Sequence, residues 1–224
     1  MPQQQLPPDS LPLASSLASE RVKVDEHRVA RYTRRRDGRH LAEMDLVERV
    51  FPELPNGAPV LDAPCGAGRM SVWMARQGWR VSALDLGGPA VAHTRKSIRE
   101  LGFEADVREG NLFELPWADG EFRAVLCFRV LHHFAEHSVR RRLMAELARV
   151  SGEHLLVSYL SPWSATGIKR RIKALLSGKR HRQNHTSLHQ LRVDLREHGF
   201  ELIRDQPQRR FFHSLHLARF LRVG

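Results

Sequence analysis

The chain has 224 residues, of which 42% are hydrophobic and 27% charged, as in an average soluble globular protein. This composition excludes a wholly disordered chain, and the longest apolar runs are far too short to cross a bilayer. The first residues lack the basic start and apolar core of a secretory signal. We therefore expect a cytoplasmic protein whose two cysteines are reduced thiols. Their spacing does not match a thiolate zinc site, so we expect no metal site.

The formal net charge of +11 is concentrated near the end of the chain. From residue 161 onward, 14 Lys and Arg residues face only four acidic ones. Such an asymmetry indicates an anionic partner, which could be a phosphate group, a nucleic acid or a membrane surface.

The N-terminal part shows two different patterns. Residues 1–19 are rich in Pro, Gln, Ser and Ala and predict a flexible tail, so we place a single domain over residues 20–224. Two helices are predicted within residues 20–51, an Arg-rich one over 20–35 and a second over 40–51. Apolar residues of the second helix recur at helical spacing on one face: Leu41, Met44, Val47 and Val50.

From residue 59 onward, short apolar strands alternate with helices. The predicted strands cover residues 59–62, 80–84, 104–108, 123–128 and 154–159, and the predicted helices cover 69–77, 89–101 and 138–150. Because the strands are almost continuously apolar, the pattern indicates a parallel sheet with helices on both faces.

The end of the chain differs from this alternation. A helix is predicted over residues 187–198, followed by strands over 200–205 and 209–217. The connection between these strands, Gln206-Pro207-Gln208, is too short for a parallel crossover, so the strands form an antiparallel hairpin. The predicted fold class is α/β, with a doubly wound, mostly parallel seven-stranded sheet that ends in this hairpin.

Two carboxylates and a glycine loop indicate a ligand site. Asp62 and Asp85 end the first two predicted strands, and Gly66-Ala67-Gly68 lies between them. Doubly wound sheets bind ligands beyond the carboxyl ends of their strands, and a carboxylate such as Asp85 can accept hydrogen bonds from both hydroxyls of a ribose. NAD is disfavoured because Ser71 stands where its fingerprint requires a third glycine or alanine, and because Asp62 would repel a pyrophosphate. A cofactor with an ammonium and a sulfonium group fits better.

Four segments resemble the motifs of class I methyltransferases, which depend on S-adenosyl-L-methionine (SAM). They are residues 60–69, residues 81–86, residues 110–117 together with 122–127, and residues 130–134. The resemblance covers about residues 41–160 and the closing hairpin, which that family also has. It implies a Rossmann-like fold, SAM as the cofactor and methyl transfer as the reaction.

The resemblance also implies roles for particular residues. Asp62 and the backbone of residues 66–68 would hold the methionine part of SAM, and Asp85 would bind the ribose. Asn111 stands where the family more often has Asp, and its amide oxygen can still accept a hydrogen bond from the adenine. The complete set of cofactor residues implied is Asp62, Ala63, Cys65, Gly66, Gly68, Asp85, Leu86, Asn111, Leu112, Phe128 and Arg129.

The site of the methyl acceptor is less defined. If the acceptor is a hydroxyl, a base helps to remove its proton, and His132 and His133 are the candidates because they follow the fourth strand. Alternatively, one of them only packs or hydrogen-bonds within the loop. His181, His185 and His189 have a helical spacing that could bind a metal. The residues around Thr186 are typical of a helix cap, however, and argue against that site.

Residues 161–186 form a predicted basic cap over the acceptor side. One face of its helix is apolar and the other basic: Ile168, Ile172, Leu175 and Leu176 against Lys169, Arg170, Arg171 and Lys173. This segment could form a lid, bind the inner face of an anionic membrane, or bind a phosphorylated acceptor.

The leading hypothesis is methyl transfer to a small-molecule or lipid-linked, anionic acceptor, with O-methylation favoured. An RNA methyltransferase is an alternative because of the basic charge. The motif of amino-group methylation is missing after the fourth strand, however, where Cys127-Phe128-Arg129-Val130 stands. A non-catalytic SAM-binding protein is a third possibility, and the oligomeric state stays open.

Overall fold

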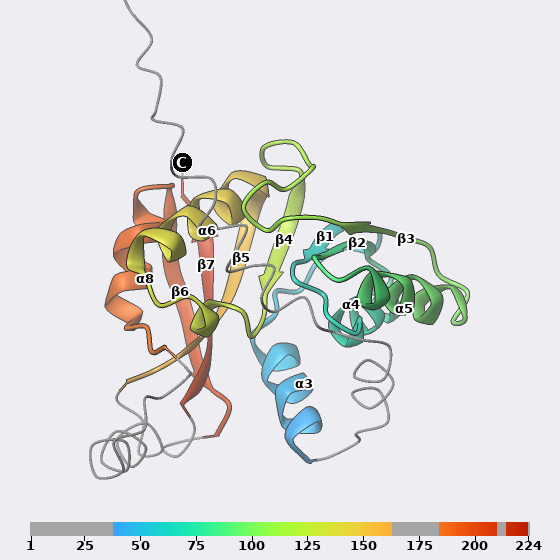
Figure 1. Cartoon of the computed structure of the whole chain (residues 1–224), viewed down its shortest axis with the longest axis horizontal. Coiled ribbons are helices and arrows are strands. Elements are labelled where there is room, and N and C mark those ends of the chain that lie inside the picture. Colours follow the sequence, from blue (N-terminus) through green and yellow to red (C-terminus); the bar gives the residue numbers. More distant parts are fainter. Residues whose placement is uncertain (1–37, 163–183, 210–213, 224) are drawn as a thin grey trace, which may run out of the picture.

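The computed structural model describes residues 38–162, 184–209 and 214–223 (Figure 1). The predicted tail, the helix over residues 20–35 and most of the basic cap lie outside these ranges. The first described element is helix α3 (Gly38–Val50). The core elements then follow in chain order: β1 (Pro59–Asp62), α4 (Arg69–Arg76), β2 (Arg80–Asp85), α5 (Gly88–Arg99), β3 (Ala105–Glu109), β4 (Phe122–Cys127), the short 3-10 helix η2 (Leu131–His133), α6 (His137–Val150), β5 (Ser151–Leu160), α8 (Leu188–Arg196), β6 (Phe200–Pro207) and β7 (Leu215–Arg222).

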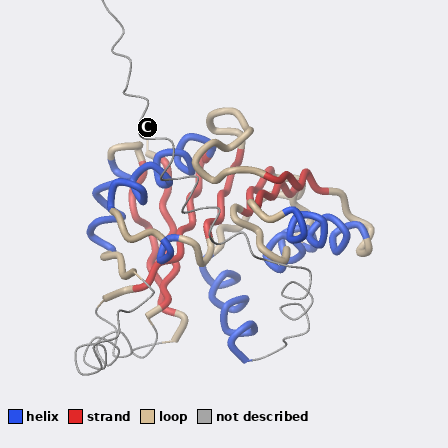
Figure 2. Tube along the Cα trace, in the orientation of Figure 1, coloured by secondary structure: helices blue, strands red, loops and turns tan. Residues whose placement is uncertain are grey.

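The strands form one seven-stranded sheet in the order β3-β2-β1-β4-β5-β7-β6 (Figures 1 and 2). Strands β1 to β5 pair in parallel, whereas β7 runs antiparallel to both β5 and β6. The predicted fold class is therefore confirmed. The order of the strands reverses between β1 and β4, which is the switch point where sheets of this kind bind ligands.

Helices cover both faces of the sheet. The apolar side chains of α3, α4 and α5 pack on one face, and those of α6 and α8 pack on the other. Strand β5 illustrates the result, because Leu155 and Val157 face α6 and α8 while Leu156 and Leu160 face the opposite core. This burial of both faces explains why the strands are almost continuously apolar.

Helix α3 forms where it was predicted and buries most of the predicted face. Leu41 is 65% exposed, whereas Glu43, Val47 and Val50 are each at most 1% exposed. Leu41 instead lines a groove of about 630 Å³ beside α4, to which Trp73 also contributes. The predicted apolar face is therefore confirmed at Val47 and Val50 and in part at Met44, which packs against the core, but it is wrong at Leu41. Glu43 is buried instead, and its charge is paired there.

The hairpin is antiparallel as predicted, but its second strand begins later than expected. The prediction placed that strand over residues 209–217, whereas β7 covers Leu215–Arg222. The three-residue turn is therefore wrong. The connection runs from Gln208 to Ser214, and the N–H of Gln208 donates to the carbonyl of Leu215 at 2.8 Å. In β7, Leu217 faces one core and Phe220 the other, and this packing sets the position of the strand.

The cap before α8 is confirmed. The hydroxyl of Ser187 accepts a hydrogen bond from the N–H of Gln190 at 3.1 Å, so the helix begins after it. His185 therefore lies before the helix and His189 lies on it, while His181 is outside the described ranges. Within those ranges, no cluster of three metal-binding side chains occurs. In the same part of the chain, no helix is long and apolar enough to span a bilayer.

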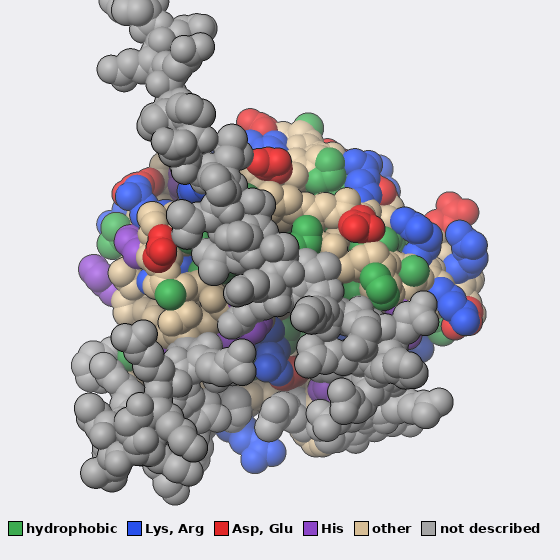
Figure 3. Space-filling model, in the orientation of Figure 1, with side chains coloured by type: hydrophobic (Ala, Val, Ile, Leu, Met, Phe, Trp, Pro, Cys, Tyr) green, Lys and Arg blue, Asp and Glu red, His purple; other side chains and the backbone are tan. Residues whose placement is uncertain are grey.

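On the face shown in Figure 3, basic and acidic side chains of the described residues lie side by side, for example at the end of the molecule that carries β3 and α5. Arg108 pairs with Asp106 at 2.7 Å and Lys96 with Glu100 at 3.7 Å. Exposed pairs of this kind each contribute at most about 1 kcal/mol. The burial of the two apolar faces therefore provides most of the stability of this domain.

Candidate cofactor and acceptor site

The loop between β1 and α4 depends on two glycines with positive φ, Gly66 at 53° and Gly68 at 75°. A Cβ atom at Gly68 would lie 2.5 Å from the hydroxyl oxygen of Thr94, so this glycine allows α4 to pack against α5. A Cβ atom at Gly66 would meet no atom within 4 Å. The space beside Gly66 is therefore open, and a ligand can lie against the loop there.

Asp85 connects the loops that follow β1 and β2. One of its carboxylate oxygens accepts a hydrogen bond from the N–H of Gly66 at 2.8 Å, and the other accepts one from the N–H of Gly87 at 2.9 Å. The residue is half-buried. Because each carboxylate oxygen has a second lone pair, Asp85 can still accept hydrogen bonds from two vicinal hydroxyls.

Asp62 is only 1% exposed, and it accepts a hydrogen bond from the hydroxyl of Ser71 at 2.6 Å. Burial raises the pKa of Asp62 to about 7, and the nearby charge of Asp85 adds to this, although the bond from Ser71 opposes it. Sequence reasoning used Ser71 only to disfavour NAD. The structure shows that this residue instead supports the carboxylate of Asp62.

We expect the substitution Asp62→Asn to stabilise the ligand-free protein at pH 8 by about 1–3 kcal/mol. Between about pH 4 and pH 7 the folded protein retains the proton of Asp62 while the unfolded chain releases it. The parent protein therefore loses stability as pH rises through this window, and the variant does not. Urea unfolding at pH 4.5 and pH 8 measures the effect, with the exposed Asp45→Asn as control. An equal gain at both pH values would contradict the raised pKa.

Two of the predicted cofactor residues shape the loop through their backbones. The N–H of Ala63 donates to the carbonyl of Leu126 at 3.0 Å, and the N–H of Cys65 donates to the carbonyl of Leu84 at 2.8 Å. The thiol of Cys65 is buried and lies 3.7 Å from the hydroxyl of Thr94. Burial also raises the pKa of this thiol.

The remaining predicted cofactor residues lie after β2, β3 and β4. Leu86 is half-buried and follows Asp85 directly. The amide oxygen of Asn111 accepts the N–H of Phe113 at 3.1 Å, so it already supports its own loop. Leu112 packs against the core beneath α6, and Phe128 is 7% exposed. Contact of these residues with a cofactor stays a prediction.

The histidine pair lies in η2, directly after β4. His132 is 3% exposed and His133 is exposed, and their ring centroids are 4.1 Å apart. The carbonyl of His132 accepts a hydrogen bond from the N–H of Asn184 at 3.0 Å. Nearby, the N–H of Thr186 donates to the carbonyl of Leu160 at the end of β5. The pair is thus held at the carboxyl edge of the sheet.

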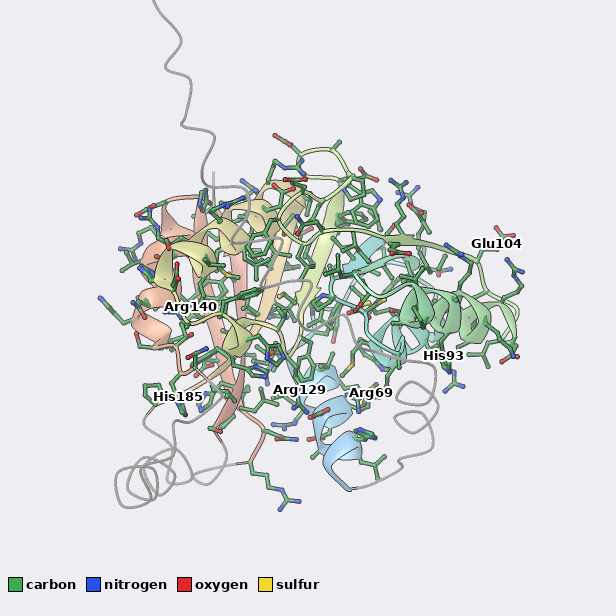
Figure 4. All side chains as sticks on the ribbon, in the orientation of Figure 1. Arg69, His93, Glu104, Arg129, Arg140 and His185 are labelled. Carbon is green, nitrogen blue, oxygen red and sulfur yellow. The ribbon has the colours of Figure 1, made fainter. Side chains whose placement is uncertain are left out.

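One residue of this region was missed by sequence reasoning. Glu43 of α3 is 1% exposed and accepts hydrogen bonds from the guanidinium groups of Arg69, at 2.6 Å, and Arg129. Figure 4 shows both arginines close to α3. The sequence did contain a signal, because Glu43 stands four and seven residues before Val47 and Val50, on the same helical stripe.

These groups fit a cofactor with a positive charge and a ribose. A ligand over the Gly66 loop would meet the buried carboxylate of Asp62 and the half-buried carboxylate of Asp85, both at the edge where the strand order reverses. An ammonium or sulfonium group is attracted by such carboxylates, whereas a pyrophosphate is repelled. The fold and this donor set together define a class I, SAM-dependent methyltransferase domain.

Comparison with known proteins agrees with this definition. Residues 60–153 match the model of a methyltransferase domain family. This part of the chain therefore belongs to the class I methyltransferases with a Rossmann-like fold, whose cofactor is SAM. The recognition made from the sequence motifs is confirmed.

The chain is 32% identical over 155 residues to a ubiquinone biosynthesis O-methyltransferase from Xanthomonas axonopodis pv. citri. The match covers 66% of this chain and 64% of that relative, so the chain spans somewhat less than two thirds of the relative's length.

Solved structures share the fold at low sequence identity. The 1,6-didemethyltoxoflavin-N1-methyltransferase of Burkholderia thailandensis, with bound S-adenosylhomocysteine (SAH), superposes with a TM-score of 0.67 at 18% identity, covering 100% of this chain and 94% of that one. The magnesium protoporphyrin IX methyltransferase of Synechocystis PCC 6803, also with bound SAH, gives a TM-score of 0.65 at 16% identity, covering 99% and 90%.

Proposed function

We propose that this protein transfers the methyl group of SAM to a hydroxyl group of a small-molecule acceptor. The observation that carries the proposal is the pair of carboxylates, Asp62 and Asp85, beside the open glycine loop at the switch point of the sheet. The name of the Xanthomonas relative, an O-methyltransferase, favours a hydroxyl acceptor.

In this proposal the two carboxylates have different tasks. Asp62 holds the ammonium group of the methionine part, and this cation favours the ionised form of a carboxyl whose pKa burial has raised to about 7. Asp85 holds the ribose hydroxyls. When bound, SAM supplies a methyl group on a cationic sulfur, so the protein mainly needs to position the acceptor against it.

His132 and His133 provide the base for the acceptor hydroxyl. They lie after β4, beside the segment at residues 184–186 that crosses the end of β5. The ring nitrogen of a neutral imidazole can accept the proton of an acceptor hydroxyl. Phe128 and Val130, which precede the pair in the chain, are apolar and at most 8% exposed.

The basic cap over residues 161–186 gives the proposal its acceptor class. Because this basic segment stands between β5 and α8 in the sequence, where we expect the acceptor specificity to lie, we propose an anionic acceptor. The acceptor is either free or lipid-linked, and the protein makes peripheral contact with an anionic membrane. The same charge would suit RNA, which is the second candidate. The cap lies mostly outside the described ranges, so these proposals rest on its sequence.

A transfer assay with methyl-labelled SAM tests the function. Lysate is separated into small-molecule, lipid, RNA and protein fractions, and each fraction is incubated with the parent protein or with the Asp85→Ala variant. We expect label in the small-molecule or lipid fraction, dependent on Asp85 and resistant to alkali, as an ether linkage is. Label in RNA alone would replace the proposed acceptor class, and label in no fraction would contradict the proposed activity.

A further inference from the structure

Two arginines share one buried carboxylate at the edge of the proposed site. Glu43 on α3 is 1% exposed, and its two carboxylate oxygens accept hydrogen bonds from Arg69 and Arg129 respectively. The side chains of the arginines are 28% and 32% exposed, so neither is a freely solvated surface cation. Two guanidinium groups against one carboxylate leave a surplus of one positive charge.

The positions of the two arginines in the chain place this surplus positive charge at the carboxyl edge of the sheet, close to the switch point. Arg69 begins α4 directly after the glycine loop that follows β1, and Arg129 follows the last residues of β4. Strands β1 and β4 flank the switch point, beyond whose carboxyl ends doubly wound sheets bind their ligands. Figure 4 shows both residues at the end of α3 that approaches the sheet.

Two observations point to a ligand site at this cluster. Nε and Nη1 of Arg69 are inaccessible to water and have no acceptor among the described residues, and buried donors of a charged group are costly when unpaired. Arg129 has a φ of 61°, which is rare for a residue with a side chain. Its N–H donates to the hydroxyl of Ser158 at 2.6 Å, which holds this conformation. Such backbone conformations concentrate at ligand sites.

We propose that Arg69 and Arg129 form a clamp that binds the carboxylate of a ligand, with Glu43 as the positioning residue that holds both guanidinium groups in place. The planar fork of Arg matches a carboxylate, and the surplus charge matches a single anion. The carboxylate comes either from the amino-acid end of the cofactor or from the acceptor. The inference rests on the proposed function, because it requires a cofactor or acceptor at this edge.

A pair of ligands that differ by one carboxylate tests the clamp. Calorimetry measures the binding of SAH and of its decarboxylated analogue, 5′-deoxy-5′-(3-aminopropylthio)adenosine, to each protein. We expect the parent protein to bind SAH at least about tenfold more tightly than the analogue. In Arg69→Gln, Arg129→Gln and Glu43→Gln, this preference falls to about threefold or less. Arg69→Lys, which retains the charge without the fork, restores part of it.

The preference is a ratio measured on one protein, so a general loosening of the fold affects both ligands and cancels. Arg49→Gln provides the matched control, because Arg49 also pairs with a carboxylate of α3, at 2.9 Å, but on the exposed surface. This control retains the parental preference.

A second arm distinguishes the source of the carboxylate. Protein saturated with SAH is titrated with 3,4-dihydroxybenzoate and with catechol, which lacks the carboxylate. If the clamp serves the acceptor, dihydroxybenzoate binds more tightly than catechol, the arginine variants lose that preference, and the preference for SAH stays unchanged.

The clamp would be overturned if every variant lost the same affinity for SAH as for its analogue, and the same affinity for dihydroxybenzoate as for catechol. Glu43 would then have only a structural role. If neither SAH nor its analogue binds the parent protein, the proposed function fails and the clamp fails with it.

Discussion

Replacing the base that accepts the proton of the acceptor is expected to lower turnover by about 10²- to 10⁴-fold. We expect this loss in His132→Ala or in His133→Ala, because both residues lie at the end of β4 where the acceptor would meet the methyl group. The affinity for SAH should stay unchanged, since neither histidine is assigned to the cofactor. Steady-state rates with the acceptor found in the transfer assay, together with calorimetry of SAH, measure the two effects separately.

The matched control is His198→Ala. His198 is exposed and precedes β6, at the opposite edge of the sheet, so its removal should not change turnover. If both His132→Ala and His133→Ala turn over at the parental rate, the reaction requires no histidine base and the protein acts through positioning alone. A loss of SAH affinity equal to the loss of turnover would instead assign the pair to the structure of the cofactor site.

The second large effect is expected for Asp85→Ala, in which SAH affinity should fall at least about tenfold. The substitution removes two charge-assisted hydrogen bonds to the ribose, each worth about 1.5–3 kcal/mol. It also removes the bonds from the N–H groups of Gly66 and Gly87 that join the two loops. Calorimetry measures the affinity, and circular dichroism checks that the fold persists.

Asp106→Ala is the matched control for this experiment. Asp106 lies on the neighbouring strand β3 and also accepts side-chain hydrogen bonds, from Arg108 and Trp117, but it is exposed and away from the glycine loop. Its removal should leave SAH affinity within about twofold of the parent, as is usual for surface substitutions. Unchanged SAH binding in Asp85→Ala would overturn the assignment of this residue to the ribose.

Local sequence signals predicted the sites that are built from neighbouring residues. Asp62, Gly66, Gly68 and Asp85 stand at strand ends and in one short loop, so their spacing alone indicated that they would meet. The open space over Gly66 and the bonds of Asp85 agree with that prediction. By contrast, the clamp joins α3 to residues that follow β1 and β4, and no local pattern relates positions 43 and 129.

The sequence by itself determined the fold class, the order of strands and helices and the family, because hydrophobic periodicity and short motifs are local properties. Only the tertiary structure decided that Glu43, rather than Leu41, is buried in the first half of α3, because two arginines that are remote in sequence neutralise its charge. It also decided where β7 begins, because the pairing of His216 with Tyr159 of β5 and Pro207 of β6 sets the register. Burial of charge and strand register depend on partners that are remote in sequence, and packing brings them together.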